Sequence, residues 1–163
     1  MDKWKKLIID FHLEEHPDDN PESPQSLHFG APATDAQISA FESEIGFRLP
    51  EEFHDLYRSC NGFGRKDDDE VIWFCAPLEE IPSLSEDVRK WFKETHPEMA
   101  AQFVAFIDWE SGDYTGYLFD EEGKVLEGIF DFVYEGYDYD RKQDPDEFLI
   151  PTFPTIKDLL EMS

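Results

Sequence analysis

The hydrophobic pattern of this chain changes its period near residue 70, and this change is the strongest constraint on its fold. Before residue 62, apolar residues recur every three or four positions, as in amphipathic helices. From residue 71 onward, most apolar residues fall in short β-branched and aromatic runs between turn residues, as in strands. This segregation predicts an α+β fold: an antiparallel meander sheet with helices packed on one side.

The N-terminal part is expected to hold one helix and a connector. The first apolar residues at helical spacing are Trp4, Leu7, Ile8 and Phe11. They predict a helix that ends near Pro17, because proline interrupts the helical hydrogen bonds. Residues 18–33 are polar and rich in proline, and they show neither a helical nor a strand period. We therefore expect a single domain over residues 1–163, with the core in residues 34–163.

Two further helices are predicted at the start of this core. Thr34 and Gln37 have the spacing of a capping box, in which each side chain accepts a hydrogen bond from the other residue's amide. Gly46 is placed to end that helix in a left-handed conformation. Pro50 suits the first turn of a second helix, which is expected to end at Asn61-Gly62. The apolar stripes of the two helices are Ile38, Phe41 and Ile45, and Phe53, Leu56, Tyr57 and Cys60.

Strands and two more helices follow. Residues 71–75 predict a buried strand, and residues 102–108, 114–119 and 124–134 predict a meander with turns between the strands. Ser85-Glu86-Asp87 has the composition of a helix start, with Val88, Trp91 and Phe92 as its buried face. Thr155 and Asp158 predict a cap for a short terminal helix.

The charge of the chain limits its partners. The formal net charge is −25, yet 15 Phe, 6 Tyr and 4 Trp residues argue for a folded core rather than a disordered chain. Nucleic-acid binding by the usual route needs a basic face, and no apolar stretch approaches the length of a membrane span. We therefore expect no direct nucleic-acid contact, no membrane contact and a basic protein as the partner.

The two cysteines point to a reducing compartment. Cys60 and Cys75 both lie in apolar runs, so buried reduced thiols are expected, and a Cys60–Cys75 disulfide is the alternative. The first seven residues have no signal-peptide core or cleavage site. Both observations favour a cytoplasmic location.

The ordered motifs of residues 33–160 resemble the SUKH superfamily, and in particular its Smi/Knr branch, named after fungal cell-wall assembly regulators. The matching positions are Thr34-Asp35-Ala36-Gln37-Ile38, Phe41-Glu42, Ile45-Gly46, Leu49-Pro50-Glu51-Glu52-Phe53, Leu56-Tyr57, Asn61-Gly62-Phe63, Phe106-Ile107, Gly112-Asp113-Tyr114 and Tyr117-Leu118-Phe119. Phe148-Leu149 resembles the start of the family's C-terminal helix.

The resemblance implies an α+β fold without a catalytic centre. It also implies a protein-binding role, because bacterial members are mostly immunity proteins that neutralise a toxin, often a nuclease. Fungal members regulate cell-wall synthesis through protein partners. The matching residues are implied to be scaffold: Gly46 and Gly62 for backbone geometry, Leu49-Pro50 for the corner between helices, and Phe41 and Tyr57 for the core.

The motifs of enzymes and metal sites have weaker support. His12, Glu15 and His16 fit a His-x-x-Glu-His zinc pattern, but they lie in the last helical turn before Pro17, where imidazolium is favoured without metal. The acids of residues 67–70 are expected in a solvated loop, because four consecutive acids cannot all face one cation. No nucleophile elbow or phosphate-binding loop is present. We therefore expect neither enzymatic activity nor a cofactor.

Acidic residues interleaved with tyrosines are the best sequence-based candidates for a partner surface. Aromatic anchors with charged neighbours are typical of protein interfaces. The candidate residues are Glu110, Asp113, Tyr134, Glu135, Tyr137, Asp138, Tyr139 and Asp140. Three functional hypotheses remain open: an immunity protein against a cognate toxin, an intracellular regulatory binding module, and a zinc hydrolase built on His12, Glu15 and His16.

Overall fold

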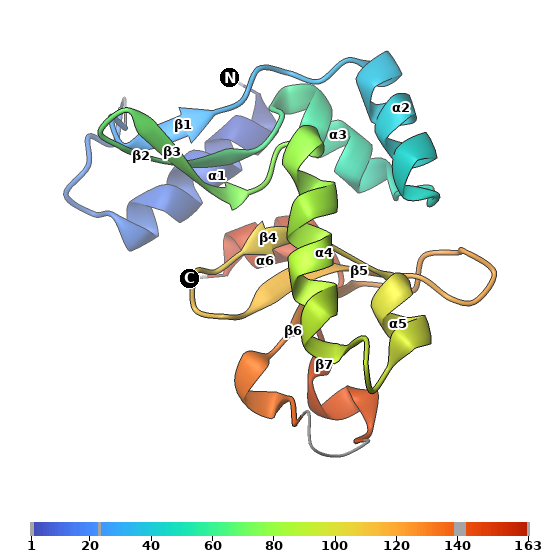
Figure 1. The fold of residues 1–163 in the computed structure, drawn as a ribbon. Coiled ribbons are helices and arrows are strands. Elements are labelled where there is room, and N and C mark those ends of the chain that lie inside the picture. Colours follow the sequence, from blue (N-terminus) through green and yellow to red (C-terminus); the bar gives the residue numbers. More distant parts are fainter. Residues whose placement is uncertain (1, 23, 139–142, 163) are drawn as a thin grey trace.

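Helices and one antiparallel sheet make up the part of the chain that this computed structural model describes, residues 2–22, 24–138 and 143–162 (Figure 1). The helices are α1 (Lys3–Glu15), α2 (Asp35–Ile45), α3 (Glu51–Ser59), α4 (Ile81–Phe92), α5 (Pro97–Ala101) and α6 (Ile156–Glu161). The strands are β1 (Leu27–Phe29), β2 (Phe63–Asp67), β3 (Glu70–Cys75), β4 (Phe103–Asp108), β5 (Tyr114–Leu118), β6 (Ile129–Phe132) and β7 (Leu149–Phe153). Short 3-10 turns are η1 (Leu78–Glu80), η2 (Tyr134–Gly136) and η3 (Pro145–Glu147).

The strands lie in the sheet in chain order, and every neighbouring pair is antiparallel. The predicted α+β class and meander are thus confirmed. The junction between β3 and β4 is narrow, since Cys75 and Ile107 are the single register pair between them in the described residues. The sheet therefore has two parts, β1–β3 and β4–β7.

Helices cover both faces of the β4–β7 part, which corrects the expectation that they pack on one side. Phe103 and Ala105 of β4 belong to one buried cluster with Val88 and Phe92 of α4. Val104 and Phe106 point the other way, into a second cluster that includes residues of α1, α3 and α6. Figure 1 shows α4 crossing in front of β4 and β5, with α6 behind them. Successive residues of β4 from 103 to 106 thus alternate between the two layers, as the pleat requires.

The helix signals of the N-terminal half are confirmed. Thr34 Oγ1 accepts a hydrogen bond from the Gln37 amide at 3.1 Å, and Gln37 Oε1 accepts one from the Thr34 amide at 2.8 Å. Gly46 ends α2 with a φ of 80°. Gly62 has a φ of 85°, and a Cβ there would lie 2.7 Å from the carbonyl oxygen of Cys75. The scaffold roles implied for these glycines therefore have a physical basis.

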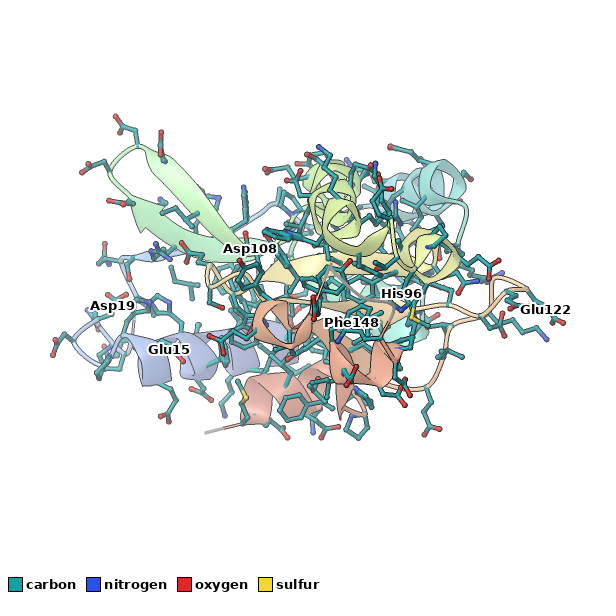
Figure 2. All side chains as sticks on the ribbon, turned by 60° about the horizontal axis from the view of Figure 1, so that its bottom comes forward. Glu15, Asp19, His96, Asp108, Glu122 and Phe148 are labelled. Atoms are coloured by element: carbon teal, nitrogen blue, oxygen red, sulfur yellow. The ribbon has the colours of Figure 1, made fainter. Side chains whose placement is uncertain are left out.

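The expected connector and acidic loop both contain strands, which corrects the sequence analysis. Residues 27–29 form β1 because they pair with Phe63, Gly64 and Arg65 of β2. Strand β2 then forms a hairpin with β3, and Asp68 and Asp69 make its turn. The four acids of residues 67–70 are exposed as expected. Figure 2 shows this hairpin projecting from the body of the molecule with carboxylates around its tip.

Other element boundaries differ from those expected. Helix α4 begins at Ile81 rather than at Ser85, with Pro82 in its first turn. Leu149 begins β7 and pairs with Phe132, so the helix implied at Phe148-Leu149 is wrong. Helix α5 was not predicted, and the third meander strand is shorter than expected. Strand β6 begins after Gly128, which has a φ of 86°, and Val125 before it forms an isolated bridge with Phe119.

The cysteines lie in the core as free, buried thiols, in agreement with the sequence analysis. The Tyr57 hydroxyl donates to the Ala76 carbonyl oxygen at 2.6 Å, and it lies 3.3 Å from Cys75 Sγ. Phe53 stacks on the Tyr57 ring at 4.2 Å between centroids. These contacts connect α3 to the end of β3 at the narrow junction of the sheet.

Candidate protein-binding surface

An exposed aromatic pair is the most distinctive feature of the surface. The rings of Trp91 and Tyr134 meet edge to face, with centroids 4.9 Å apart and planes at 78°. Trp91 is 44% exposed and Tyr134 is 46% exposed. Tyr134 was among the predicted partner-binding residues, whereas Trp91 was expected in the core. Trp91 lies one residue before Phe92 at the margin of the buried stripe of α4, and its ring covers Tyr134 rather than the sheet.

Carboxylates border this pair. Asp87 precedes Trp91 by one helical turn of α4, so both lie on the same face of that helix. Burial raises the pKa of the Tyr114 hydroxyl, and the nearby charges of Asp108 and Asp87 raise it further. We call this surface the Trp91 patch, and its members are Asp87, Trp91, Asp108, Asp113, Tyr114 and Tyr134.

The β4–β5 turn fixes the position of Tyr134. Asp113 Oδ1 accepts a hydrogen bond from the Tyr134 amide at 3.0 Å. Gly112 has a φ of 94°, and a Cβ there would lie 3.3 Å from the Tyr134 side chain. The turn and η2 are adjacent because Tyr114 of β5 pairs with Phe132 of β6. Two of the predicted residues, Asp113 and Tyr134, are therefore brought together.

The other predicted residues after Tyr134 have different environments. Glu135 is exposed, while Tyr137 and Asp138 are partly buried. The Tyr137 hydroxyl lies 2.8 Å from Thr95 Oγ1, and its ring packs against Phe148 at 5.0 Å. Tyr137 therefore connects its segment to the core, close to the Phe148 and His96 side chains that Figure 2 labels. Tyr139 and Asp140 lie outside the described residues, and partner binding by this segment stays a prediction.

Glu110 lies beside a different part of the surface. Both of its carboxylate oxygens accept hydrogen bonds from Arg65 of β2. These bonds lower the pKa of the Glu110 carboxyl group. Glu110 has a φ of 61°, and its amide donates to Asp108 Oδ1 at 2.8 Å. The pair thus connects the two parts of the sheet, and the Glu110 backbone contacts Asp108 at the edge of the Trp91 patch.

The geometry around His12 argues against the zinc hypothesis. His12 is buried, and its Nε2 lies 2.9 Å from Asp19 Oδ2 and 3.1 Å from Ser26 Oγ. This nitrogen is therefore occupied by protein partners. Among residues 2–22, 24–138 and 143–162, no group of three or more His, Cys, Asp or Glu side chains is arranged to hold a metal ion.

The same residues do not form a catalytic triad. A triad histidine uses one ring nitrogen for the carboxylate and the other for the serine. Here Asp19 and Ser26 contact the same nitrogen of His12, and Ser26 Oγ also donates to Asp19 Oδ2 at 2.5 Å. The hydrogen bonds from Ser26 and His12 lower the pKa of Asp19 well below its usual range. The cluster anchors the chain after α1 instead of activating the serine.

Fold and surface together define an α+β domain that presents an acidic, aromatic patch and a meander sheet. The chain belongs to the SMI1 / KNR4 family (SUKH-1), whose model matches residues 32–162. The suggested resemblance is therefore confirmed. No curated protein matches the chain. In the part of the chain that the structure describes, no helix has the length and apolar character needed to span a membrane.

Proposed function

We propose that this chain is a non-enzymatic, cytoplasmic immunity protein that binds a basic cognate toxin, expected to be a nuclease, of a bacterial polymorphic or contact-dependent toxin system. The Trp91–Tyr134 pair is the observation that carries this proposal, because both rings are exposed and fixed in place by α4 and the β4–β5 turn. Rigid aromatic side chains contribute most of the binding free energy in many protein interfaces.

The charges around the pair support a basic partner. Asp87 and Asp113 border the rings, and Asp108 lies near the Tyr114 hydroxyl. The net charge of −25 attracts cations over longer distances. Complementary charge raises association rates and fixes the orientation of the complex more than it raises affinity. The aromatic pair would therefore hold the toxin, while the carboxylates guide it to the patch.

Co-expression of the chain with the protein encoded next to its gene tests the proposal. We expect restored growth and a stoichiometric complex. Exchange of both patch aromatics, Trp91→Ala with Tyr134→Ala, is expected to weaken the complex at least about thirtyfold, as for typical hot-spot residues. Leu126→Ala is the matched control, because Leu126 is 38% exposed and lies near Glu122. Figure 2 shows Glu122 at the right edge of the molecule, away from Asp108 near its middle.

Two results would contradict the proposal. If co-expression gives neither growth nor a complex, the chain is not the immunity protein of that toxin. If the double variant binds as tightly as the Leu126→Ala control, the Trp91 patch is not the binding surface. Stable capture of a cellular regulatory protein in the absence of the toxin would favour the regulatory alternative instead.

A further inference from the structure

A half-enclosed cavity of about 260 Å³ lies between the end of α1, strands β2 and β3, and the β4–β5 turn. Its lining includes the large aromatic side chains Phe11, Phe63, Phe74 and Trp109 and the imidazole rings of His12 and His16. Pockets for drug-sized ligands usually measure roughly 300–1,000 Å³, so this cavity suits one side chain rather than a large cofactor.

The aromatic walls form a corner that is fixed in advance. The rings of Phe74 and Trp109 lie 4.8 Å apart with their planes at 86°, and both side chains are partly exposed. Trp109 Nε1 donates to Thr115 Oγ1 at 2.8 Å, and that hydroxyl donates to Asp131 Oδ1 at 2.5 Å. The indole therefore needs no reorganisation to receive a ligand, which reduces the entropic cost of binding.

The charges at the cavity favour a cation. Arg65 is the permanently cationic lining residue, but Glu110 neutralises it through a two-bond ion pair. The imidazoles of His12 and His16 also line the cavity, and they carry a positive charge only when protonated. Glu15 also lines the cavity, and its carboxylate is exposed. A cation that enters would meet aromatic faces and a carboxylate, and ring faces attract ammonium and guanidinium groups.

We propose that this cavity binds the side chain of an arginine or lysine from the basic protein partner. The source of that side chain rests on the proposed function, whereas the cavity's preference for an alkylguanidinium or alkylammonium group does not. The cavity adjoins the Trp91 patch but shares no residue with it: Trp109 and Glu110 line the cavity, while Asp108, directly before them, belongs to the patch. A partner that engages both would therefore contact each side of the β4–β5 turn.

Titration of the free protein with N-acetyl-arginine amide tests the cavity without any toxin. The probe is the indole N–H resonance of Trp109 in a nitrogen-correlated NMR spectrum, assigned through Trp109→Phe. We expect a saturable shift with a dissociation constant on the order of millimolar, as befits so small a ligand. The uncharged analogue N-acetyl-norleucine amide is expected to bind about two- to thirtyfold more weakly, the range of one cation–π contact.

Two matched variants separate the effect of a charge at the cavity from the effect of the protein's net charge. Glu15→Gln is expected to weaken arginine-amide binding by about two- to fivefold, the range of an exposed ion pair. Glu14→Gln removes the same charge from the preceding position. Glu14 does not line the cavity, so this substitution is expected to leave binding unchanged. Equal binding of the arginine and norleucine amides, or no saturable shift at all, would overturn the proposal. Either result would leave the Trp91 patch test untouched.

Discussion

Gly64 and Gly46 are both needed as glycine, but for different physical reasons. Gly64 of β2 has no unusual φ, but a Cβ there would lie 2.1 Å from the Ile72 carbonyl oxygen of the paired strand. Gly46 ends α2 with a φ of 80°, and a Cβ there would have no other atom within 4 Å. The first position is restricted by contact with a neighbouring backbone, and the second only by its own conformation.

This difference predicts unequal costs for the same substitution. Gly64→Ala must displace a neighbouring strand, so we expect a loss of about 2–4 kcal/mol in the free energy of unfolding. Gly46→Ala only forces an alanine into the left-handed conformation, so we expect it to lower the free energy of unfolding by about 1–2 kcal/mol. Urea unfolding followed by tryptophan fluorescence measures both. Equal losses would mean that the strand contact relaxes at little cost.

The buried thiols predict a specific chemical behaviour. Burial raises the pKa of Cys60 to about 12, and it also raises the pKa of Cys75. Because the thiolate is the reactive form, neither residue should react with a thiol reagent at pH 8 in the folded protein, and both should react after unfolding. Rapid labelling of one residue before unfolding would show that its surroundings open locally.

The same pKa shifts affect stability at high pH. A group whose pKa is raised by folding stabilises the fold fully below its unfolded pKa, about 8.5 for cysteine, and this stabilisation is lost as pH rises through the folded value. For Cys60 the loss falls between about pH 8.5 and 12. We therefore expect the melting temperature of Cys60→Ala to depend less on pH over this range than that of the parent chain.

At the scale of elements, local signals predicted those helices whose ends are determined by their own residues. Thr34, Gln37 and Gly46 determine α2 through contacts within a few residues, and the sequence contains all of them. Strand β1 is different, because its three residues become a strand only through pairing with β2, which lies more than thirty positions further along the chain. Non-local pairing of this kind leaves no periodic pattern in so short a segment.

The candidate surface was also predictable only in part, because composition is a local signal and the packing of distant segments is not. Tyr134 and Asp113 were found from their acidic and aromatic composition, which indicates exposure. Trp91 was missed because helical spacing places it next to the buried Phe92, and only the position of η2 shows that its ring lies outside the core. The cavity was also missed, since its lining residues come from five separate segments.

The β2–β3 hairpin carries an element-scale prediction. Its two turn residues are Asp68, with a φ of 56°, and Asp69, whose φ is not positive. A positive φ at the first turn position alone is the pattern of a type II′ turn, which prefers glycine there. Asp68→Gly relieves this strain and removes one of four adjacent negative charges, so we expect a gain of about 0.5–1 kcal/mol in unfolding free energy.

Asp69→Gly is the matched control for this hairpin. It removes the same charge at the neighbouring turn position, but glycine offers no conformational relief there. We expect no gain, or a small loss from the greater freedom of glycine in the unfolded chain. Equal gains from both substitutions would mean that charge repulsion, not backbone conformation, limits the hairpin.

At the scale of the whole molecule, the net charge of −25 has opposite consequences for folding and for association. Carboxylates that repel one another destabilise the compact state, whereas the same field attracts a basic partner. Salt screens both interactions, with a Debye length of about 10 Å at 0.1 M. Added salt should therefore stabilise the free protein and slow its association with the partner.

We expect an increase from about 20 to 300 mM NaCl to raise the melting temperature by roughly 2–5 °C and to lower the association rate constant about 10- to 100-fold. Thermal unfolding and stopped-flow fluorescence measure the two effects. Neutralising three exposed acids outside the Trp91 patch (Glu14, Glu121 and Glu127 to Gln) should reproduce both effects weakly at low salt and leave the dissociation rate unchanged. A melting temperature that falls with salt would mean that ion pairs such as Arg58–Asp35 outweigh the net repulsion.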